Sequence, residues 1–439
     1  MTQSDSYFDV VGIGFGPANI ALSIVAEETA DATDMIFLEG GEVPQWQPGM
    51  LISDSDIQNN PVRDLVSLRN PRSRYSFINY LHEVGRLHDY LNLPLEFPLR
   101  KDFAQYVKWA GEQVHAKVHF GSTAQSVQRR GDKFSVRDAR GQSYDTRSVV
   151  VGTGRSLKIP EEFEPLLGND VFHSTSYLQH IDKIMAFSPS PHILLVGASQ
   201  SAVELALDIR GRNPHARVTL VSRGIGPRLK DTSPFTEYAY FPEFTDYYYA
   251  LEPQQKRRLD LELRNSNYSA ADADVIERLS VAMYEDRLDG EQRTTLRKFS
   301  AVDSAAKEES RIRVRFREVH TGQSESALFD AVILATGFRD LGPSDHQERV
   351  PAVLNPVAED LEYDEDGRLR VSRDYQLSWK NGSPAGIFLN GLCESSHGLG
   401  DAGSFSLLSL RSERVLRGLQ NHLSDSTPLH PQTLVGQAS

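Results

Sequence analysis

Glycine-rich turns that follow apolar strands constrain this chain more than any other feature of its sequence. The first turn, Gly12-Ile13-Gly14-Phe15-Gly16-Pro17, joins an expected buried strand at residues 8–13 to an expected helix at residues 18–28. Gly12 would permit the tight turn, and Gly14 would let the backbone approach a pyrophosphate at the helix N-terminus. Pro17 replaces the third glycine of the usual pattern, and proline suits a first helical turn. This turn predicts a dinucleotide site.

An acidic residue, Glu39, ends the next expected strand. It is suitably placed to accept hydrogen bonds from a ribose, which suits FAD or NAD and disfavours the 2′-phosphate of NADP. A glycine-rich turn alone could be an ordinary strand–helix corner, but its strand context together with Glu39 favours a cofactor. We therefore interpret the first unit as the FAD site.

The second turn is Gly197-Ala198-Ser199-Gln200-Ser201-Ala202. A positively charged residue follows it, where the first unit has the negatively charged Glu39. Gly197, Ser199 and Ala202 occupy the three key positions, and all are small enough for close approach. Arg223 stands at the end of the following strand, in the place that corresponds to Glu39. A guanidinium can neutralise a 2′-phosphate, so this unit predicts an NADPH site. The alternative is a surface arginine on a structural turn.

Strands that alternate with helices indicate parallel sheets covered on both faces. We expect an α/β protein with two Rossmann-like dinucleotide-binding domains, for FAD and NADPH, and a small, mostly helical substrate-binding insertion. The expected parts are residues 1–165 and 334–439 for FAD, 166–227 and 301–333 for NADPH, and 228–300 for the insertion. A C-terminal helix is expected at residues 404–423, and a loose tail beyond Ser424.

Composition excludes several classes of protein. The formal net charge is −13 and no Lys/Arg cluster is present, which argues against nucleic-acid binding. No apolar run approaches the roughly 18 residues of a membrane span. Cys393 is the single cysteine, so an internal disulfide and a cysteine-based metal cluster are excluded, and no metal site is expected. Residues 1–7 are polar, without a signal-peptide pattern, so we expect a cytoplasmic protein.

With these residues placed, the chain resembles the class B flavin monooxygenases, specifically the N-hydroxylating branch that acts on L-ornithine and L-lysine. The resemblance runs from residue 8 to about residue 418. The matching segments, in the family's order, are Trp46-Gln47-Pro48-Gly49-Met50, residues 58–68 with Arg69-Asn70-Pro71-Arg72-Ser73, His173-Ser174-Thr175-Ser176-Tyr177, residues 197–204, Asp231-Thr232-Ser233-Pro234-Phe235, Asn265-Ser266-Asn267-Tyr268-Ser269 and His397-Gly398-Leu399. Each segment alone is a weak signal, but their shared order is specific.

The resemblance implies the reaction. NADPH would reduce the flavin, O₂ would add to form a C4a-hydroperoxyflavin, and a primary amine would attack the distal oxygen to give an N-hydroxylamine and water. An alkyl amine has a pKa near ~10.4, so the pocket must favour its neutral form. The resemblance also implies a homo-oligomer, often a tetramer, and a role in the biosynthesis of siderophores or other natural products.

The resemblance also implies the site residues. Gln58 would lie beside the isoalloxazine ring, within a flavin-facing region that includes Trp46 and Gln47. Gln200 and Ser201 would contact the nicotinamide nucleotide, with Arg223 on its phosphate.

On the substrate side, Asn267 would hydrogen-bond the amine substrate. Ser409 and the backbone near Leu408 would line the pocket mouth close to the flavin. An ordinary loop amide is the alternative for Gln58, and a helix-capping asparagine is the alternative for Asn267.

Three departures from the family pattern bear on the substrate. Arg63 stands where ornithine hydroxylases typically have a lysine that pairs with the substrate carboxylate, and Glu237 replaces an asparagine. Extra residues occur at 400–405, near the flavin. A carboxylate at position 237 would repel a substrate carboxylate unless Arg63 neutralises it, or would favour a cationic substrate end. A decarboxylated amine (putrescine, cadaverine or histamine) and another amino acid such as aspartate therefore remain alternatives to ornithine and lysine.

Other kinds of protein fit less well. A disulfide-type flavin reductase needs a redox cysteine pair, whereas Cys393 is alone. A Baeyer–Villiger or S-oxygenating monooxygenase would lack the Asn-x-Asn-Tyr-Ser and Ser-Pro-Phe features. A non-catalytic nucleotide-binding sensor would keep both turns but show no NADPH-dependent oxygen uptake.

Overall fold

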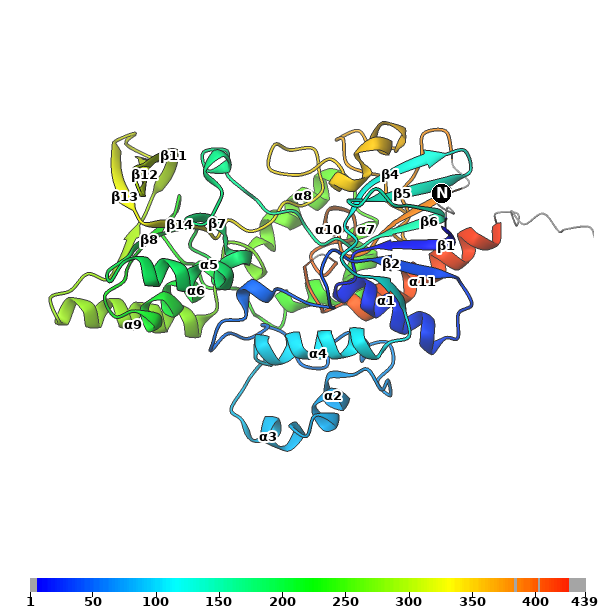
Figure 1. Ribbon diagram of the computed structural model, residues 1–439, viewed down its shortest axis with the longest axis horizontal. Coiled ribbons are helices and arrows are strands. Elements are labelled where there is room, and N and C mark those ends of the chain that lie inside the picture. The colour runs from blue at the N-terminus through cyan, green and yellow to red at the C-terminus, as the bar shows by residue number, and fades with distance from the viewer. Residues whose placement is uncertain (1–5, 383–384, 402, 426–439) are drawn as a thin grey trace, which may run out of the picture.

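The larger sheet and its helices form the expected first nucleotide-binding unit. The computed structural model describes residues 6–382, 385–401 and 403–425 (Figure 1). Strand order in this sheet is β3-β2-β1-β6-β5-β4, with β15 also paired to β6. The strands are β1 (Ser6–Ile13), β2 (Met35–Leu38), β3 (Lys117–His119), β4 (Ala124–Arg130), β5 (Lys133–Asp138), β6 (Ser143–Val151) and β15 (Gly386–Leu389). β1, β2, β3, β6 and β15 pair in parallel, whereas β4, β5 and β6 form an antiparallel meander.

Helix α1 (Pro17–Glu28) is buried almost all round because it lies between this sheet and other helices. Its residues 19–26 are all buried, as expected for a helix that is apolar on every side. α11 (Leu408–Asp425) packs against α1 with Val415, Leu416 and Leu419 in the same core. Other helices of this unit are α2 (Phe77–Glu83), α3 (Leu87–Asn92), α4 (Arg100–Gln113) and α10 (Glu394–His397), with 3-10 turns η1 (Pro48–Met50) and η6 (Ala352–Asp360).

The second sheet is parallel throughout and matches the expected second nucleotide-binding unit. Its order is β10-β9-β8-β14-β7. The strands are β7 (Val171–His173), β8 (His192–Val196), β9 (Arg217–Val221), β10 (Thr294–Arg297) and β14 (Ala331–Leu334), and the helices are α5 (Tyr177–Phe187), α6 (Gln200–Arg212) and α9 (Ala273–Leu288), with 3-10 turns η2 (Glu164–Leu166) and η3 (Ser174–Ser176).

The two faces of this second sheet are covered differently. Ile193 and Leu195 of β8 point into a core shared with α5, α6 and α9, whereas Leu194 points into a core with β-strands. Those strands form the antiparallel sheet β11 (Ser300–Glu308), β12 (Arg311–Glu318) and β13 (Ser324–Phe329), at the upper left in Figure 1. Alternation along each strand thus sends successive side chains to the two different layers.

The helical insertion is shorter than the expected residues 228–300. Its helices are η4 (Thr236–Tyr240), α7 (Pro242–Tyr249), α8 (Pro253–Glu262) and η5 (Arg264–Ser266). α9 instead packs on α6 with Val275 and Leu279 in the core of the second unit, and β10 pairs with β9. Residues 273–297 therefore complete the second unit, because their apolar side chains have their partners there.

The C-terminal helix also begins later than expected. α11 starts at Leu408 and not at residue 404. The residues before it are not helical, and the Ser404 side chain accepts a hydrogen bond from the backbone N–H of Ser406. The expected loose tail falls on residues 426–439, outside the described residues. Within the described part of the chain, no helix is both long enough and apolar enough to cross a membrane.

Candidate active site

The turn between β1 and α1 is shaped by three glycines with different roles. Gly14 has a φ of +84°, and a Cβ there would lie 2.7 Å from the carbonyl oxygen of Gly152. Gly12 lies within β1, where a Cβ would fall 2.2 Å from the Phe37 ring. The tight turn is therefore made at Gly14, and the expectation that Gly12 permits it was wrong: Gly12 serves strand packing.

The start of α1 is open towards a ligand. Gly16 is the N-cap, with no heavy atom within 4 Å of its ideal Cβ, and Pro17 opens the helix as expected. Nearby, both oxygens of Glu39 accept backbone hydrogen bonds, Oε2 from Phe15 at 2.6 Å and Oε1 from Gly41 at 2.8 Å. A carboxylate has lone pairs for more than two donors, and Glu39 is only half-buried, so a ribose hydroxyl still fits. These residues fit the pyrophosphate and ribose of FAD.

The second turn has the same design. Gly197 has a φ of +136°, and a Cβ there would lie 2.4 Å from the carbonyl oxygen of Ala335. Ser199 is the N-cap of α6, and its side chain makes no capping hydrogen bond. Ser199, Gln200 and Ser201 line a large cavity of about 800 Å³. At this helix start the N–H of Gln200 donates to the Ala270 carbonyl oxygen, and Ser199 and Ser201 border the cavity, where the N-terminus of a helix favours an anion.

A group of cations lines the same cavity. Arg223 is joined there by Lys158 and Arg264, which come from distant parts of the chain. Burial, and then the charges of Arg223, Arg264 and Arg339, lower the pKa of Lys158. Cations gathered this closely favour a phosphate ligand, which fits NADPH. The sequence did not reveal Lys158 and Arg264, because neither lies near the second turn along the chain.

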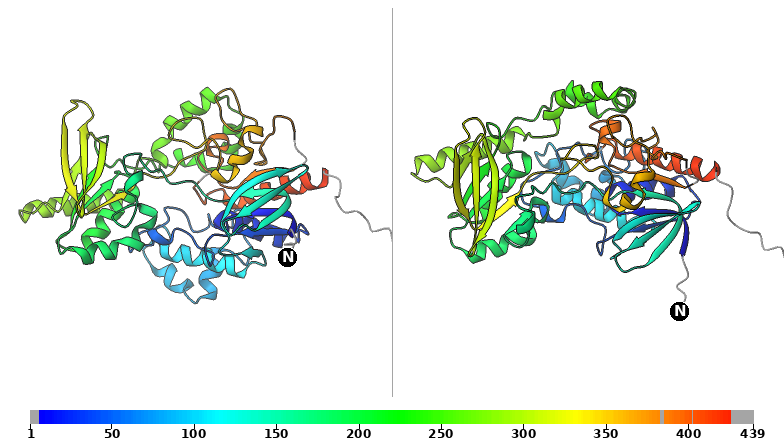
Figure 2. Two further views of the ribbon diagram at one scale, coloured as in Figure 1. Left: turned by 45° about the horizontal axis from the view of Figure 1, so that its top comes forward. Right: turned by 90° about the horizontal axis from the view of Figure 1, so that it is seen from above.

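The cavity lies where the two nucleotide-binding units and the insertion meet. In both views of Figure 2 the bright green helices of the insertion lie along the upper edge of the molecule, and α7 packs against α10 of the first unit. Trp46, Gln47 and Gln58 line the cavity from the first unit, and Glu237 and Asn267 line it from the insertion side. The structure therefore brings together the residues expected beside the flavin, the nicotinamide nucleotide and the substrate.

Arg63 and Glu237 pair with each other in this cavity. Nη1 of Arg63 lies 3.2 Å from Oε2 of Glu237 and donates to the Ser406 hydroxyl at 3.4 Å. The sequence left open whether Arg63 and Glu237 pair with each other or with the substrate. In the structure they form a direct ion pair. Their charges compensate each other before any substrate binds.

Leu408 and Ser409 do not line this cavity, contrary to expectation. Both are buried in the first turn of α11, and Leu408 belongs to the core of the first unit. Phe405 and Ser406, which come just before them in the chain, line the cavity instead. Of the extra residues at 400–405, Ala402 lies outside the described residues. The Phe405 ring packs edge-on against Trp46, with centroids 5.1 Å apart.

The buried hydroxyl of Ser409 has no hydrogen-bond partner among the described residues. Such a group costs free energy unless a ligand satisfies it.

An acid that the sequence did not reveal also lines the cavity. Glu394 accepts a hydrogen bond from the Tyr268 hydroxyl, and Arg155 donates to that hydroxyl at 2.8 Å and to Asp340 at 2.9 Å. Burial, followed by the charge of Asp340, raises the pKa of Glu394 to about 8. This network anchors Tyr268, the neighbour of Asn267, and so holds the segment expected to contact the substrate.

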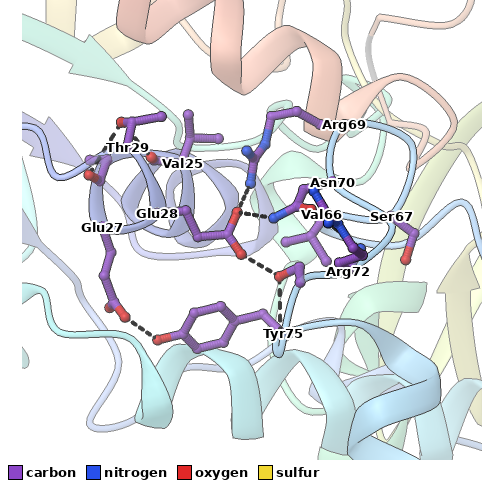
Figure 3. Close-up of polar contacts among 12 residues, drawn as sticks. Val25, Glu27, Glu28, Thr29, Val66, Ser67, Arg69, Asn70, Arg72 and Tyr75 are labelled. Carbon is purple, nitrogen blue, oxygen red and sulfur yellow. Dashed lines mark hydrogen bonds and ion pairs between the residues drawn. The ribbon is translucent and has the colours of Figure 1, made fainter.

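The segment Arg69-Asn70-Pro71-Arg72-Ser73 has a structural role. Arg69, Asn70 and Ser73 all donate to the Glu28 carboxylate at the end of α1, as Figure 3 shows for Arg69 and Asn70. Beside it, the Tyr75 hydroxyl donates to Glu27 at 2.7 Å. These contacts tie the loop that carries Gln58 and Arg63 to the first nucleotide-binding helix, away from the cavity.

Comparisons with known proteins agree with this geometry. Residues 6–340 match the family described as L-lysine 6-monooxygenase/L-ornithine 5-monooxygenase. The L-ornithine N(5)-monooxygenase of Pseudomonas aeruginosa is 34% identical, with 97% of each chain covered. That of Burkholderia cepacia is 37% identical, with 90% of this chain and 91% of the relative covered.

Solved structures give the same result. The ornithine hydroxylase PvdA of Pseudomonas aeruginosa superposes with a TM-score of 0.86 at 32% identity, covering 95% of this chain and 100% of that one. The Kutzneria sp. 744 ornithine N-hydroxylase KtzI, described with reduced FAD, NADP⁺ and L-ornithine, gives 0.88 at 28% identity, covering 94% and 99%. The chain therefore belongs to the L-lysine 6-monooxygenase/L-ornithine 5-monooxygenase family and is an N-hydroxylating flavin monooxygenase.

Proposed function

We propose that this enzyme uses FAD, NADPH and O₂ to hydroxylate the side-chain amine of an α-amino acid of the L-ornithine type. The observation that carries the choice of substrate is the Arg63–Glu237 ion pair in the cavity wall, with 3.2 Å between Nη1 and Oε2. The ornithine monooxygenases among the relatives support the same choice.

A zwitterionic wall is complementary to a zwitterionic head group. The guanidinium of Arg63 has five N–H donors, and only Nη1 is engaged with Glu237 and Ser406. Its other donors can bind the α-carboxylate of an amino acid, while Glu237 can accept from the α-ammonium. A diamine has no carboxylate to accept hydrogen bonds from Arg63, and its second ammonium group would lie near that cation. The pair therefore favours an amino acid over putrescine or cadaverine.

The reacting amine must lose its proton to become a nucleophile. Lys158, Lys230 and Arg155 also line the cavity, and nearby cations lower the pKa of a bound amine. When bound, FAD passes electrons from NADPH to O₂ and supplies the oxygen chemistry. The roles of this chain's residues are to orient the amine at the Gln58 side of the cavity and to exclude water from it.

The test is a hydroxylamine-forming assay with the purified holoenzyme over ornithine, lysine, aspartate, putrescine, cadaverine and histamine. NADPH oxidation and oxygen uptake are followed in the same samples. We expect ornithine or lysine to give the highest kcat/KM. Faster turnover of putrescine or cadaverine would contradict the amino-acid assignment. A colourless protein with no NADPH-dependent oxygen uptake would favour the nucleotide-binding sensor.

The assembly and location of the enzyme are predictions of the family resemblance alone. We propose a homotetramer in the cytoplasm, acting in siderophore or related natural-product biosynthesis. Light scattering of the purified protein would measure the number of subunits.

A further inference from the structure

One aspartate, Asp272, touches two glutamines that come from the two different nucleotide-binding units. Its carboxylate accepts a hydrogen bond from Nε2 of Gln58, and its backbone N–H donates to Oε1 of Gln200 at 2.8 Å. We propose that Asp272 is a positioning residue that orients the Gln58 amide and links it to nucleotide binding at α6. This inference rests on the proposed function, in which Gln58 faces the flavin and Gln200 faces NADPH.

The ordinary role of an aspartate in this place does not account for its contacts. Asp272 is the N-cap of α9, where an aspartate normally accepts hydrogen bonds from its own helix. Here its side chain makes no capping hydrogen bond. The carboxylate instead faces Gln58, with Nζ of Lys230 at 3.9 Å from its other oxygen. The side chain of Asp272 thus contacts a residue of the first unit and does not cap its own helix.

The contact determines which way the Gln58 amide points. A carboxylate without a proton can only accept, so Gln58 must turn its NH₂ group towards Asp272. The backbone of Gln58 is held as well, because its φ is +54° and its N–H donates to Oδ1 of Asp56 at 2.8 Å. Without Asp272 the backbone would stay in place, but the amide could rotate and exchange its donor and acceptor ends.

The other end of the link is rigid. Gln200 donates from Nε2 to Glu204 at 2.9 Å, and Glu204 is held by two hydrogen bonds from Arg100, each 2.9 Å long. Both charged side chains are buried, at 9% and 4% exposure. Arg100 belongs to α4 of the first unit, so Gln200 is clamped between the units. A nucleotide that binds against Gln200 therefore bears directly on the residue that orients Gln58.

Two substitutions at the same position separate the contact from the helix cap. Asp272→Ser keeps a good N-cap residue but is too short to reach Gln58, whereas Asp272→Asn keeps both the cap and an acceptor oxygen. The measured quantity is the hydroxylamine formed per NADPH consumed, together with KM for NADPH, in samples matched for flavin content. Asp274→Ser is the control, because Asp274 is exposed on the same helix.

We expect Asp272→Ser to lower the coupled fraction about five-fold, the typical effect of one hydrogen bond. KM for NADPH should stay within about two-fold, because the backbone N–H of residue 272 still donates to Gln200. Asp272→Asn should stay near the wild type. In a Gln58→Ala background, Asp272→Ser should cause no further loss of coupling, because it acts through Gln58.

Full coupling in Asp272→Ser, equal loss in both position-272 variants, or additive loss in the double variant would each overturn the proposal. If the wild-type enzyme hydroxylates no amine, the proposed function fails instead, whatever the variants do.

Discussion

Replacing Arg63 with alanine tests the substrate assignment most directly. The substitution removes the expected partner of the substrate carboxylate and leaves Glu237 without its cation. A charge-assisted hydrogen bond contributes about 1.5–3 kcal/mol. The Arg63 and Glu237 side chains are 24% and 30% exposed, so solvent screens the contact and the lower part of that range applies.

A loss of about 1.5–2 kcal/mol corresponds to a fall of about 10- to 30-fold in kcat/KM for ornithine. Putrescine lacks the carboxylate, so its kcat/KM should rise roughly three-fold once the opposing cation is gone. The selectivity for ornithine over putrescine should therefore fall by a factor on the order of 30–100.

The assay is the initial rate of hydroxylamine formation with each amine, at saturating NADPH and equal flavin content. Arg72→Ala is a matched control, because Arg72 is an exposed arginine further along the same loop. Equal losses on ornithine and putrescine would refute the reasoning, since they would show that Arg63 supports the fold of the site and not the carboxylate.

Three further predictions concern the cofactors and a buried acid. Arg223→Ala should raise KM for NADPH about 10- to 100-fold and leave KM for NADH within about two-fold, because only NADPH carries the 2′-phosphate; equal effects on both coenzymes in steady-state kinetics would contradict this. Gly14→Ala should weaken FAD binding about ten-fold or more, because φ is +84° and the new Cβ would lie 2.7 Å from the Gly152 carbonyl oxygen; the flavin content of the purified protein measures it. Glu394 has its pKa raised to about 8, so its contribution to stability is full below its unfolded pKa near 4.5 and is lost as pH rises towards 8. The Tm of Glu394→Gln minus that of the wild type should therefore increase as pH rises from about 4.5 to about 8 and stay constant above that. A Tm difference that does not vary with pH would rule this out.

Parts of the site could be predicted because their chemistry is local in sequence. Each nucleotide turn lies within a few residues of its strand and helix, and Glu39 and Arg223 follow at the end of the next strand. Such contacts depend on short-range backbone geometry, which residue type and spacing reveal. The α/β class and the two nucleotide-binding units are confirmed for this reason.

The missed features are all contacts between distant segments. The length of the insertion was wrong because the apolar face of α9 indicates a buried helix but not which core buries it. Leu408 and Ser409 were expected in the cavity wall, yet the position of that wall depends on how Phe405 packs against Trp46. Asp272 and Glu394 gave no signal in sequence because their partners lie on other elements.

The sequence by itself therefore determined the class of the protein, and it predicted two cofactor sites with opposite charges beside them. Only the tertiary structure decided that Arg63 pairs with Glu237 and that Asp272 joins Gln58 to the start of α6. The physical reason is that charge type and backbone turn are properties of a segment. An ion pair or a hydrogen bond is a property of two segments, which packing brings together.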